Sequence, residues 1–173
     1  GKKIGAQLGT TGYIYAGDVE DATVEPYNKG ADAVQALKQG KLDAVIIDSE
    51  PAKAFVAKND TLKILDDPFA EEEYAIAYKK GNDELGQKLD DALTKLKEDG
   101  TLDEIVSHWI GDNADQKSYT PDDSVERDGT LVMATNAEFP PYESVDGDTI
   151  VGVDVDMMQA VCDEIGMELK VEI

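Results

Sequence analysis

The chain has 173 residues, of which 41% are hydrophobic and 31% are charged, a composition typical of a globular protein with one domain or two small ones. Its 38 Asp and Glu residues against 16 Lys and Arg give a formal charge of -22, which argues against nucleic acid and anionic lipid as partners. No apolar run approaches the roughly 20 residues of a membrane span, so no direct membrane span is predicted.

Predicted strands and helices alternate through the first 65 residues. Strands are predicted at 2–8, 23–27, 42–47 and 62–65, and helices at 13–19, 31–39 and 51–58. This alternation is typical of parallel βαβ units with both faces of the sheet covered. Gly1 leads directly into the first strand pattern, so no signal peptide is visible, although a cleaved leader would leave the same pattern.

Two of the predicted strand ends carry groups that suit an amino-acid ligand. The first strand enters the loop Gly9-Thr10-Thr11-Gly12, where backbone N–H groups and a helix start favour an anion. The third strand ends at Asp48. Ligands of such sheets bind beyond the carboxyl ends of the strands, so the two groups suit a ligand with a carboxylate and an ammonium. The alternatives are an ordinary tight turn for the loop and a helix cap for Asp48.

After residue 65 the βα alternation breaks at 66–73, a segment with three consecutive glutamates. The elements predicted beyond it are a strand at 74–78, a Leu-rich amphipathic helix at 83–97, a helix from Thr101 to Ile110 opened by a capping box with Glu104, a polar linker at 111–129, a strand at 130–135, a Pro-Pro loop at 136–142, a turn at 145–149, a helix at 154–166 capped by Asp154, and a last strand at 167–173.

The single cysteine and the single histidine limit the chemistry of the chain. Cys162 can form no internal disulfide, and its apolar neighbours at helical spacing predict a buried thiol. His108 excludes a two-histidine metal site, and its place near a helix end indicates a cap or surface role. We predict no catalytic residue, no metal and no cofactor.

Several stretches together resemble one family. The stretches 135–143 (TNAEFPPYE) and 150–156 (IVGVDVD) resemble the start of an extracytoplasmic polar amino-acid-binding protein, a solute-binding protein of ABC importers. The stretches 2–12 and 42–48 resemble its second lobe, and 74–81 with the Leu-rich helix and Trp109 resembles its ending. The resemblance implies an α/β fold of the periplasmic-binding-protein type, the two-lobe type II fold, incomplete and permuted in this chain.

The order of these stretches differs from the family's order. The resemblance implies that 1–68 is most of lobe 2, 69–110 the C-terminal part of lobe 1, 111–129 a linker and 130–173 the N-terminal part of lobe 1. The family's central segment, with an arginine that clamps the ligand carboxylate, is absent, and Arg127 does not match it. Two explanations remain open: a junction between tandem binding domains, or one half of a protein that needs a complementary segment.

The resemblance also implies a ligand site. Its residues are Gln7, Thr10, Thr11, Asp48, Asn136, Glu138, Phe139 and Tyr142. Thr10 and Thr11 are expected to hold the ligand carboxylate, and Asp48 its α-ammonium. Phe139 is expected to stack on the ligand side chain, with Tyr142 as a second aromatic wall or as packing. Asn136 and Glu138 line the side-chain end, and Gln7 reaches the same pocket. The alternatives are a core aromatic for Phe139 and a solvated acid for Glu138.

The implied function is binding of a free polar amino acid between two lobes, with hinge closure through 66–73 and delivery to an ABC import permease. The implied location is extracytoplasmic, in the periplasm or at the cell surface, with lipid anchoring as one option for the full-length protein. Without the clamping arginine, the isolated chain is expected to bind weakly or not at all. The alternatives are a sensing domain of a receptor and a cyclic-acid dehydratase with Glu138 as its acid or base. A phosphate-dependent enzyme is disfavoured because no Walker lysine follows Gly12.

Overall fold

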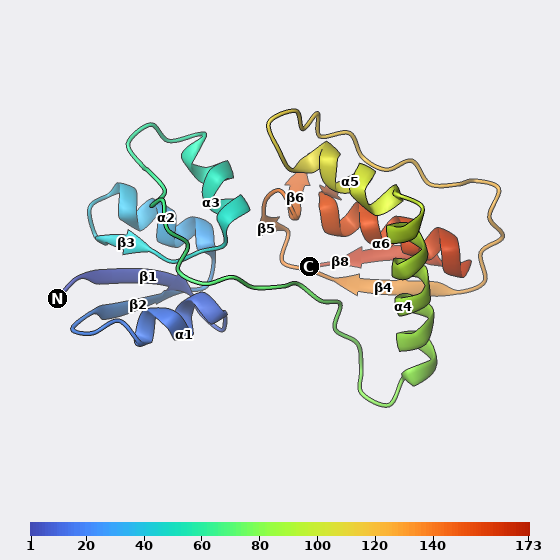
Figure 1. Cartoon of the computed structure of the whole chain (residues 1–173), viewed down its shortest axis with the longest axis horizontal. Coiled ribbons are helices and arrows are strands. Elements are labelled where there is room, and N and C mark those ends of the chain that lie inside the picture. The colour runs from blue at the N-terminus through green and yellow to red at the C-terminus, as the bar shows by residue number, and fades with distance from the viewer. The chain divides into compact units, whose positions relative to one another are not determined.

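The computed structural model describes residues 1–173 and divides into two compact units (Figure 1). Unit 1 consists of Gly1–Glu72 and Glu138–Pro140, and unit 2 of Glu73–Ala137 and Pro141–Ile173. No helix in the chain combines the length and the hydropathy that a membrane span requires.

Unit 1 is built on a three-stranded parallel sheet in the order β2-β1-β3, which confirms the predicted parallel βαβ units. The elements are β1 (Lys3–Gln7), α1 (Thr11–Gly17), β2 (Thr23–Tyr27), α2 (Gly30–Lys38), β3 (Ala44–Val45) and α3 (Ser49–Val56). Alternate residues of β1 face opposite sides. Ile4 packs in one core cluster with Ala16 of α1, whereas Gly5 faces Ala33 of α2. Helices α1 and α2 therefore cover opposite faces of the sheet, as Figure 1 shows.

Two predicted strands of unit 1 are wrong in extent or existence. The third strand was predicted over 42–47, but β3 covers only Ala44–Val45, the two residues that pair with Ile4 and Gly5 of β1. No strand forms over 62–65, where Leu65 remains 72% exposed. An apolar run becomes a strand only when a neighbouring strand pairs with it, and no strand pairs with residues 62–65.

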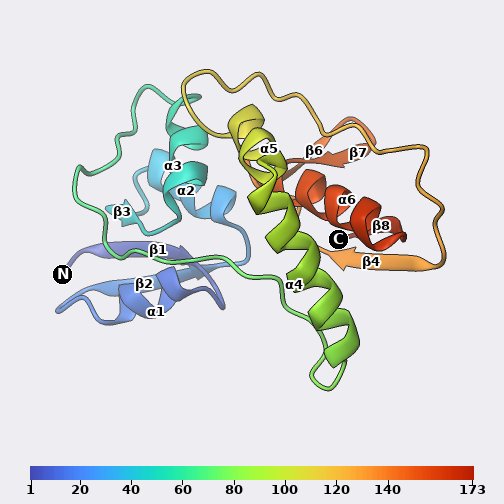
Figure 2. The same ribbon diagram turned by 45° about the vertical axis from the view of Figure 1, so that its right-hand side comes forward.

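Unit 2 combines a two-stranded parallel sheet, a hairpin and three helices. Its elements are α4 (Asp83–Glu98), α5 (Thr101–Trp109), β4 (Thr130–Ala134), β6 (Glu143–Asp146), β7 (Thr149–Val151), α6 (Val153–Ile165) and β8 (Glu168–Glu172). Strand β4 pairs with β8, and β6 pairs with β7 across the turn predicted there. Leu96, Trp109 and Val161 share one core cluster, so α4, α5 and α6 pack together (Figure 2). Stretches before and after residues 111–129 therefore form a single core.

Three local predictions in unit 2 are wrong. Residues 74–78 form no strand, and Tyr78 instead packs its hydroxyl against Gly86 of α4. The cap of α5 is Gly100, in the left-handed region with φ 87°, and the Asp99 carboxylate accepts the Thr101 amide. The start of α5 is thus stabilised by the Asp99 side chain and not by the predicted capping box of Thr101 and Glu104.

The third wrong local prediction is the cap of α6. Gly152, not Asp154, precedes its first turn. Gly152 has φ 140°, and a Cβ there would lie 2.2 Å from the Tyr142 carbonyl oxygen, so glycine is required. The amides of Val153 and Asp154 donate to the carbonyls of Pro141 and Tyr142 at 3.1 and 3.0 Å. These bonds hold the end of the Pro-Pro loop against α6.

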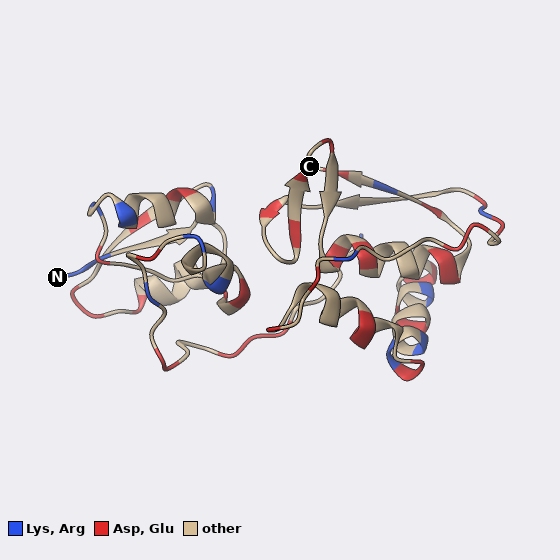
Figure 3. Cartoon of the chain, turned by 90° about the horizontal axis from the view of Figure 1, so that it is seen from above, with Lys and Arg blue, Asp and Glu red and all other residues tan.

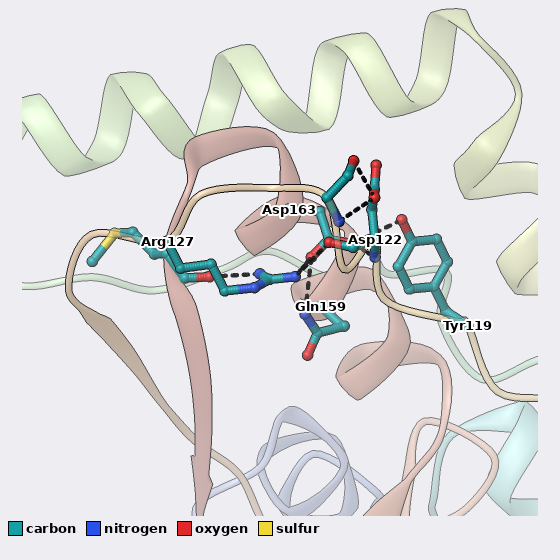
Figure 4. Close-up of polar contacts among 7 residues, drawn as sticks. Tyr119, Asp122, Arg127, Gln159 and Asp163 are labelled. Atoms are coloured by element: carbon teal, nitrogen blue, oxygen red, sulfur yellow. Dashed lines mark hydrogen bonds and ion pairs between the residues drawn. The ribbon is translucent and has the colours of Figure 1, made fainter.

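Residues 111–129 contain no helix or strand, and helix α6 holds them through two buried carboxylates. Asp163 accepts hydrogen bonds from the Tyr119 hydroxyl at 3.1 Å and from the Asp122 amide at 2.8 Å, and it pairs with Arg127 at 2.7 Å (Figure 4). Asp156 accepts the Trp109 indole N–H at 2.7 Å and the Tyr119 amide at 2.9 Å. Burial and the Asp163 bond raise the pKa of Tyr119 to about 12. The segment is therefore an ordered strap across unit 2.

Candidate functional site

The candidate site of unit 1 lies at the carboxyl edge of its parallel sheet. Each of the three strands leads there into a helix, and the N-cap positions are held by Thr10 in α1, Lys29 in α2 and Asp48 in α3. Of these, only Thr10 makes a side-chain capping hydrogen bond. Helix starts present unpaired backbone N–H groups and partial positive charge. The parallel arrangement thus brings three such starts to one edge.

Two glycines allow these helix starts to approach the end of β3. A Cβ on Gly12 would lie 3.2 Å from the Ile46 carbonyl oxygen. A Cβ on Gly30 would lie 2.8 Å from Ile47 and 3.6 Å from the side-chain oxygen of Gln7. Side chains at either position would push α1 or α2 away from the segment that carries Asp48. Gln7 and the start of α2 are therefore neighbours at this edge.

Thr10 and Thr11 differ in what their hydroxyls do. The Thr10 hydroxyl donates to the Gln7 carbonyl at 2.7 Å and accepts the Tyr13 amide at 3.3 Å, so it orders the loop. The Thr11 hydroxyl is exposed and donates to a carboxylate oxygen of Glu72 at 2.6 Å. The Tyr15 hydroxyl donates to the other oxygen of Glu72 at 2.9 Å. The Thr11 hydroxyl at the loop and the Tyr15 hydroxyl one turn later on α1 thus donate to the same carboxylate, that of Glu72.

The segment before Glu72 is attached to α1 as well. The ring of Phe69 lies 5.8 Å from the ring of Tyr15. The hydrogen bond to Glu72 raises the pKa of the Tyr15 phenol, and the nearby negative charge adds to this. Sequence analysis did not single out Tyr15 or Glu72. The position of Tyr15 one turn after Thr11 was the available signal.

Asp48 stands at the start of α3 but makes no side-chain capping hydrogen bond to it. The alternative interpretation of Asp48 as a simple side-chain cap is therefore not what the structure shows. Its backbone carbonyl accepts the Ala52 amide at 2.9 Å, which begins the helix.

Lys29 is the residue of this edge that sequence analysis missed. Its ammonium pairs with the Glu138 carboxylate at 2.5 Å, and this hydrogen bond raises the pKa of Lys29. Glu138 and Phe139 form the short strand β5 (Glu138–Phe139), which contacts α2 within unit 1. The available signal was the place of Lys29 directly before the Gly30 helix start. Gln7, Lys29 and Glu138 are thus brought to one corner of the edge.

Asn136 and Tyr142 belong to unit 2. The ring of Tyr142 packs at 4.9 Å against the ring of Tyr74, and Asn136 is half-buried in the loop after β4. Next to Tyr142, Glu143 is only 7% exposed, and its Oε2 has no hydrogen-bond partner. Burial, followed by the contact with Asp154, raises the pKa of Glu143 to about 8, and burial also raises that of Asp154. The buried carboxyl of Glu143 and the half-buried carboxyl of Asp154 thus form an interacting pair.

Across residues 1–173, no group of three or more His, Cys, Asp or Glu side chains is arranged to hold a metal ion. Cys162 is fully buried in α6, as predicted, and burial raises the pKa of its thiol to about 11. His108 lies in the last turn of α5 and pairs with Asp115 at 2.6 Å. Neither residue lies in unit 1, where the carboxyl edge is.

Residues 20–112 and 131–173 match the family model of the bacterial extracellular solute-binding proteins, family 3. The L-cystine-binding protein TcyJ of Escherichia coli (strain K12) is 34% identical over 113 residues, which cover 64% of this chain and 42% of TcyJ. The putative ABC transporter arginine-binding protein 2 of the same strain is 35% identical over 116 residues, covering 64% and 48%. The glutamine-binding protein GlnH of Bacillus subtilis (strain 168) is 36% identical over 90 residues, covering 52% and 33%.

Among solved structures, the P235GK mutant of ArgBP from T. maritima is similar, with a TM-score of 0.61 and 38% sequence identity. The similarity covers 63% of this chain and 48% of that one. The chain thus spans less than half the length of each of these relatives. All of the curated relatives named here are binding proteins, which supports the prediction that the chain is not an enzyme.

Proposed function

Because the chain belongs to the bacterial extracellular solute-binding proteins, family 3, we propose that it is part of a protein that binds a free polar amino acid and delivers it to the permease of an ABC importer. The relatives named above bind cystine, arginine and glutamine, which supports a polar amino acid as the ligand. The observation that carries the proposal is the carboxyl edge of unit 1, where the Thr11 hydroxyl donates to a carboxylate.

Each proposed contact follows from chemistry at that edge. The Thr11 hydroxyl and the first amides of α1 donate hydrogen bonds to the ligand carboxylate, while Thr10 orders the loop. Asp48 receives the α-ammonium in a charge-assisted hydrogen bond. Gln7, Glu138 and Phe139 line the ligand side chain. For Asn136 and Tyr142, the family resemblance alone supports a ligand contact.

A complementary segment is part of the proposal. The chain spans less than half of its relatives, and its only arginine, Arg127, is engaged by Asp163. An arginine that clamps the ligand carboxylate would therefore come from a segment outside these residues. The proposed location is extracytoplasmic, in the periplasm or at the cell surface, with or without a lipid anchor. Hinge closure through residues 66–73 would complete the site and shift the population to the closed state on ligand binding.

The test is a titration of the ¹⁵N-labelled chain with L-glutamine and L-arginine, followed by amide chemical shifts. Of the two outcomes expected for the isolated chain, weak binding and no binding, the proposal commits to weak binding. We expect saturable shifts of Thr11, Gly12 and Ser49, with affinity weaker than micromolar because the clamping arginine is missing. Asp48→Asn should weaken binding by about ten-fold, since it removes the charge of one charge-assisted bond. Asp18→Asn, the same change at the far end of α1, is the matched control and should leave affinity unchanged.

Two results would refute the proposal. The first is an absence of saturable shifts at the carboxyl edge with either amino acid up to tens of millimolar. The second is an equal loss of affinity in the Asp48 and Asp18 variants, which would show a general charge effect in place of a specific contact.

A further inference from the structure

The ion pair between Lys29 and Glu138 joins two segments that lie 109 residues apart in sequence. Both side chains are partly exposed, at 49% and 39%, so a ligand at the carboxyl edge can reach them. Lys29 directly precedes Gly30, over which the side-chain oxygen of Gln7 lies. Glu138 directly precedes Phe139. The pair therefore stands among the groups proposed to line the ligand side chain.

The pair changes the charge that a ligand side chain meets. A lone Glu138 would attract a cationic side chain, but its carboxylate already holds the Lys29 ammonium at 2.5 Å. The other charged group that acts on Lys29 is Asp32, in the first turn of α2. A cation that binds the free acceptor positions of Glu138 also meets the charge of the Lys29 ammonium, and an anion that binds Lys29 also meets the charge of Glu138. Each charged side-chain end is therefore attracted by one member of the pair and repelled by the other.

A net-neutral group that both donates and accepts hydrogen bonds meets a different situation. The Lys29 ammonium has three N–H donors and the Glu138 carboxylate has several acceptor positions, so each has capacity beyond the pair. A carboxamide can accept from Lys29 through its oxygen and donate to Glu138 through its nitrogen. It thereby adds two hydrogen bonds without opening the ion pair.

We infer that Lys29 and Glu138 together determine specificity, and that they select an amino acid whose side chain ends in a net-neutral group with both a donor and an acceptor over one with a cationic or anionic end. This inference rests on the proposed function, because it concerns the ligand of the same site. It narrows the ligand class from polar amino acids in general to those of the glutamine type.

The experiment compares the affinities for L-glutamine, L-arginine and L-glutamate in the full chain, by the same amide-shift titration. In the wild type, glutamine should bind at least about three-fold more tightly than either charged ligand. Lys29→Gln leaves Glu138 alone and should improve arginine relative to glutamine by about three- to ten-fold, the range expected of exposed charges. Glu138→Gln should improve glutamate relative to glutamine to a similar extent.

Two further variants make the test specific. Lys2→Gln removes the same charge from unit 1 at the amino edge of the sheet, where Lys2 pairs with Asp43 at 2.9 Å, and should not change the ligand order. The exchange variant Lys29→Glu/Glu138→Lys restores a pair of reversed polarity, and it should again prefer glutamine. Its behaviour also decides the question if a single variant fails to fold.

The results separate this inference from the proposed function. Binding at the carboxyl edge with the same ligand order in the wild type, both single variants and the exchange variant would overturn the specificity role alone. So would a change of order in Lys2→Gln equal to that in Lys29→Gln. An absence of saturable shifts with all three amino acids in every variant would overturn the proposed function, and this inference with it.

Discussion

The interaction of buried Glu143 with half-buried Asp154 predicts an unusual dependence of stability on pH. Glu143 on β6 is 7% exposed, and burial with the neighbouring Asp154 raises its pKa from 4.5 to about 8. In the unfolded chain the same carboxyl returns to its ordinary pKa. Between these two values the folded protein holds a proton that the unfolded chain has lost.

The sign and size of the effect follow from this difference. Below pH 4.5 both states are protonated, and the stability contributed by the protonated carboxyl is fully present. As pH rises toward 8, the unfolded state alone gains by ionising, so the free energy of unfolding falls. At about 1.4 kcal/mol per pKa unit the full shift corresponds to roughly 5 kcal/mol, and solvent screening near the loop reduces it to about 2–4 kcal/mol.

Glu143→Gln removes the titrating group and keeps a donor for Asp154. Urea unfolding at pH 5 and pH 8.5, followed by the fluorescence of Trp109, measures the effect in unit 2, because Trp109 is the only tryptophan and lies in its core. The free energy of unfolding of the variant, relative to the wild type, should rise by about 2–4 kcal/mol between these pH values. Parallel pH curves for the two proteins would refute the reasoning.

Three other predictions concern the strap, the thiol and the net charge. Arg127→Met should lower the free energy of unfolding by about 3 kcal/mol, because Asp163 is left buried without its cation. In the double variant with Asp163→Asn most of this loss should disappear, and an equal loss in both variants would contradict the role of the pair. Cys162 is fully buried, so at pH 8 a thiol reagent should label it roughly a thousand-fold more slowly in the folded protein than in urea; rapid native labelling would be inconsistent with its burial. Asp and Glu outnumber Lys and Arg along the chain (Figure 3), so their mutual repulsion should destabilise the fold and salt should screen it. Raising NaCl from 0.05 to 1 M should therefore raise the melting temperature by about 5 °C, and an unchanged melting temperature would argue against charge repulsion as a destabilising force.

The family and the type II fold class were predictable because several motifs agree, and the family match confirms both. Elements that depend on local pattern were also predictable: β2 has the predicted bounds, and α4 differs by one residue at its end. Elements that depend on a distant neighbour were not. The apolar run at 74–78 has strand composition but forms no strand, because secondary structure in a sheet requires a partner that composition does not reveal.

The candidate site shows the same division. Thr10, Thr11 and Asp48 could be placed at strand ends from the βα alternation, since parallel topology brings those ends together. Lys29 and Glu72 could not be found this way. They meet their partners across 57 to 109 residues of sequence, and a charged residue in an acidic chain carries no mark of such a contact.

The strap at residues 111–129 connects two parts of unit 2 that also pack against each other directly, so unit 2 can be expected to stay together when the strap is cut. Its two tryptic sites differ: Lys117 is exposed, whereas the Arg127 guanidinium is held by Asp163 and by the Met167 carbonyl. Proteases cleave backbone that can leave its contacts, so trypsin should cut the strap after Lys117 and spare Arg127. Because α4 and α5 share one core with α6, the pieces on either side of the cut should remain associated. We therefore expect unit 2 to behave as an assembly of two chain segments that persists without the covalent link between them.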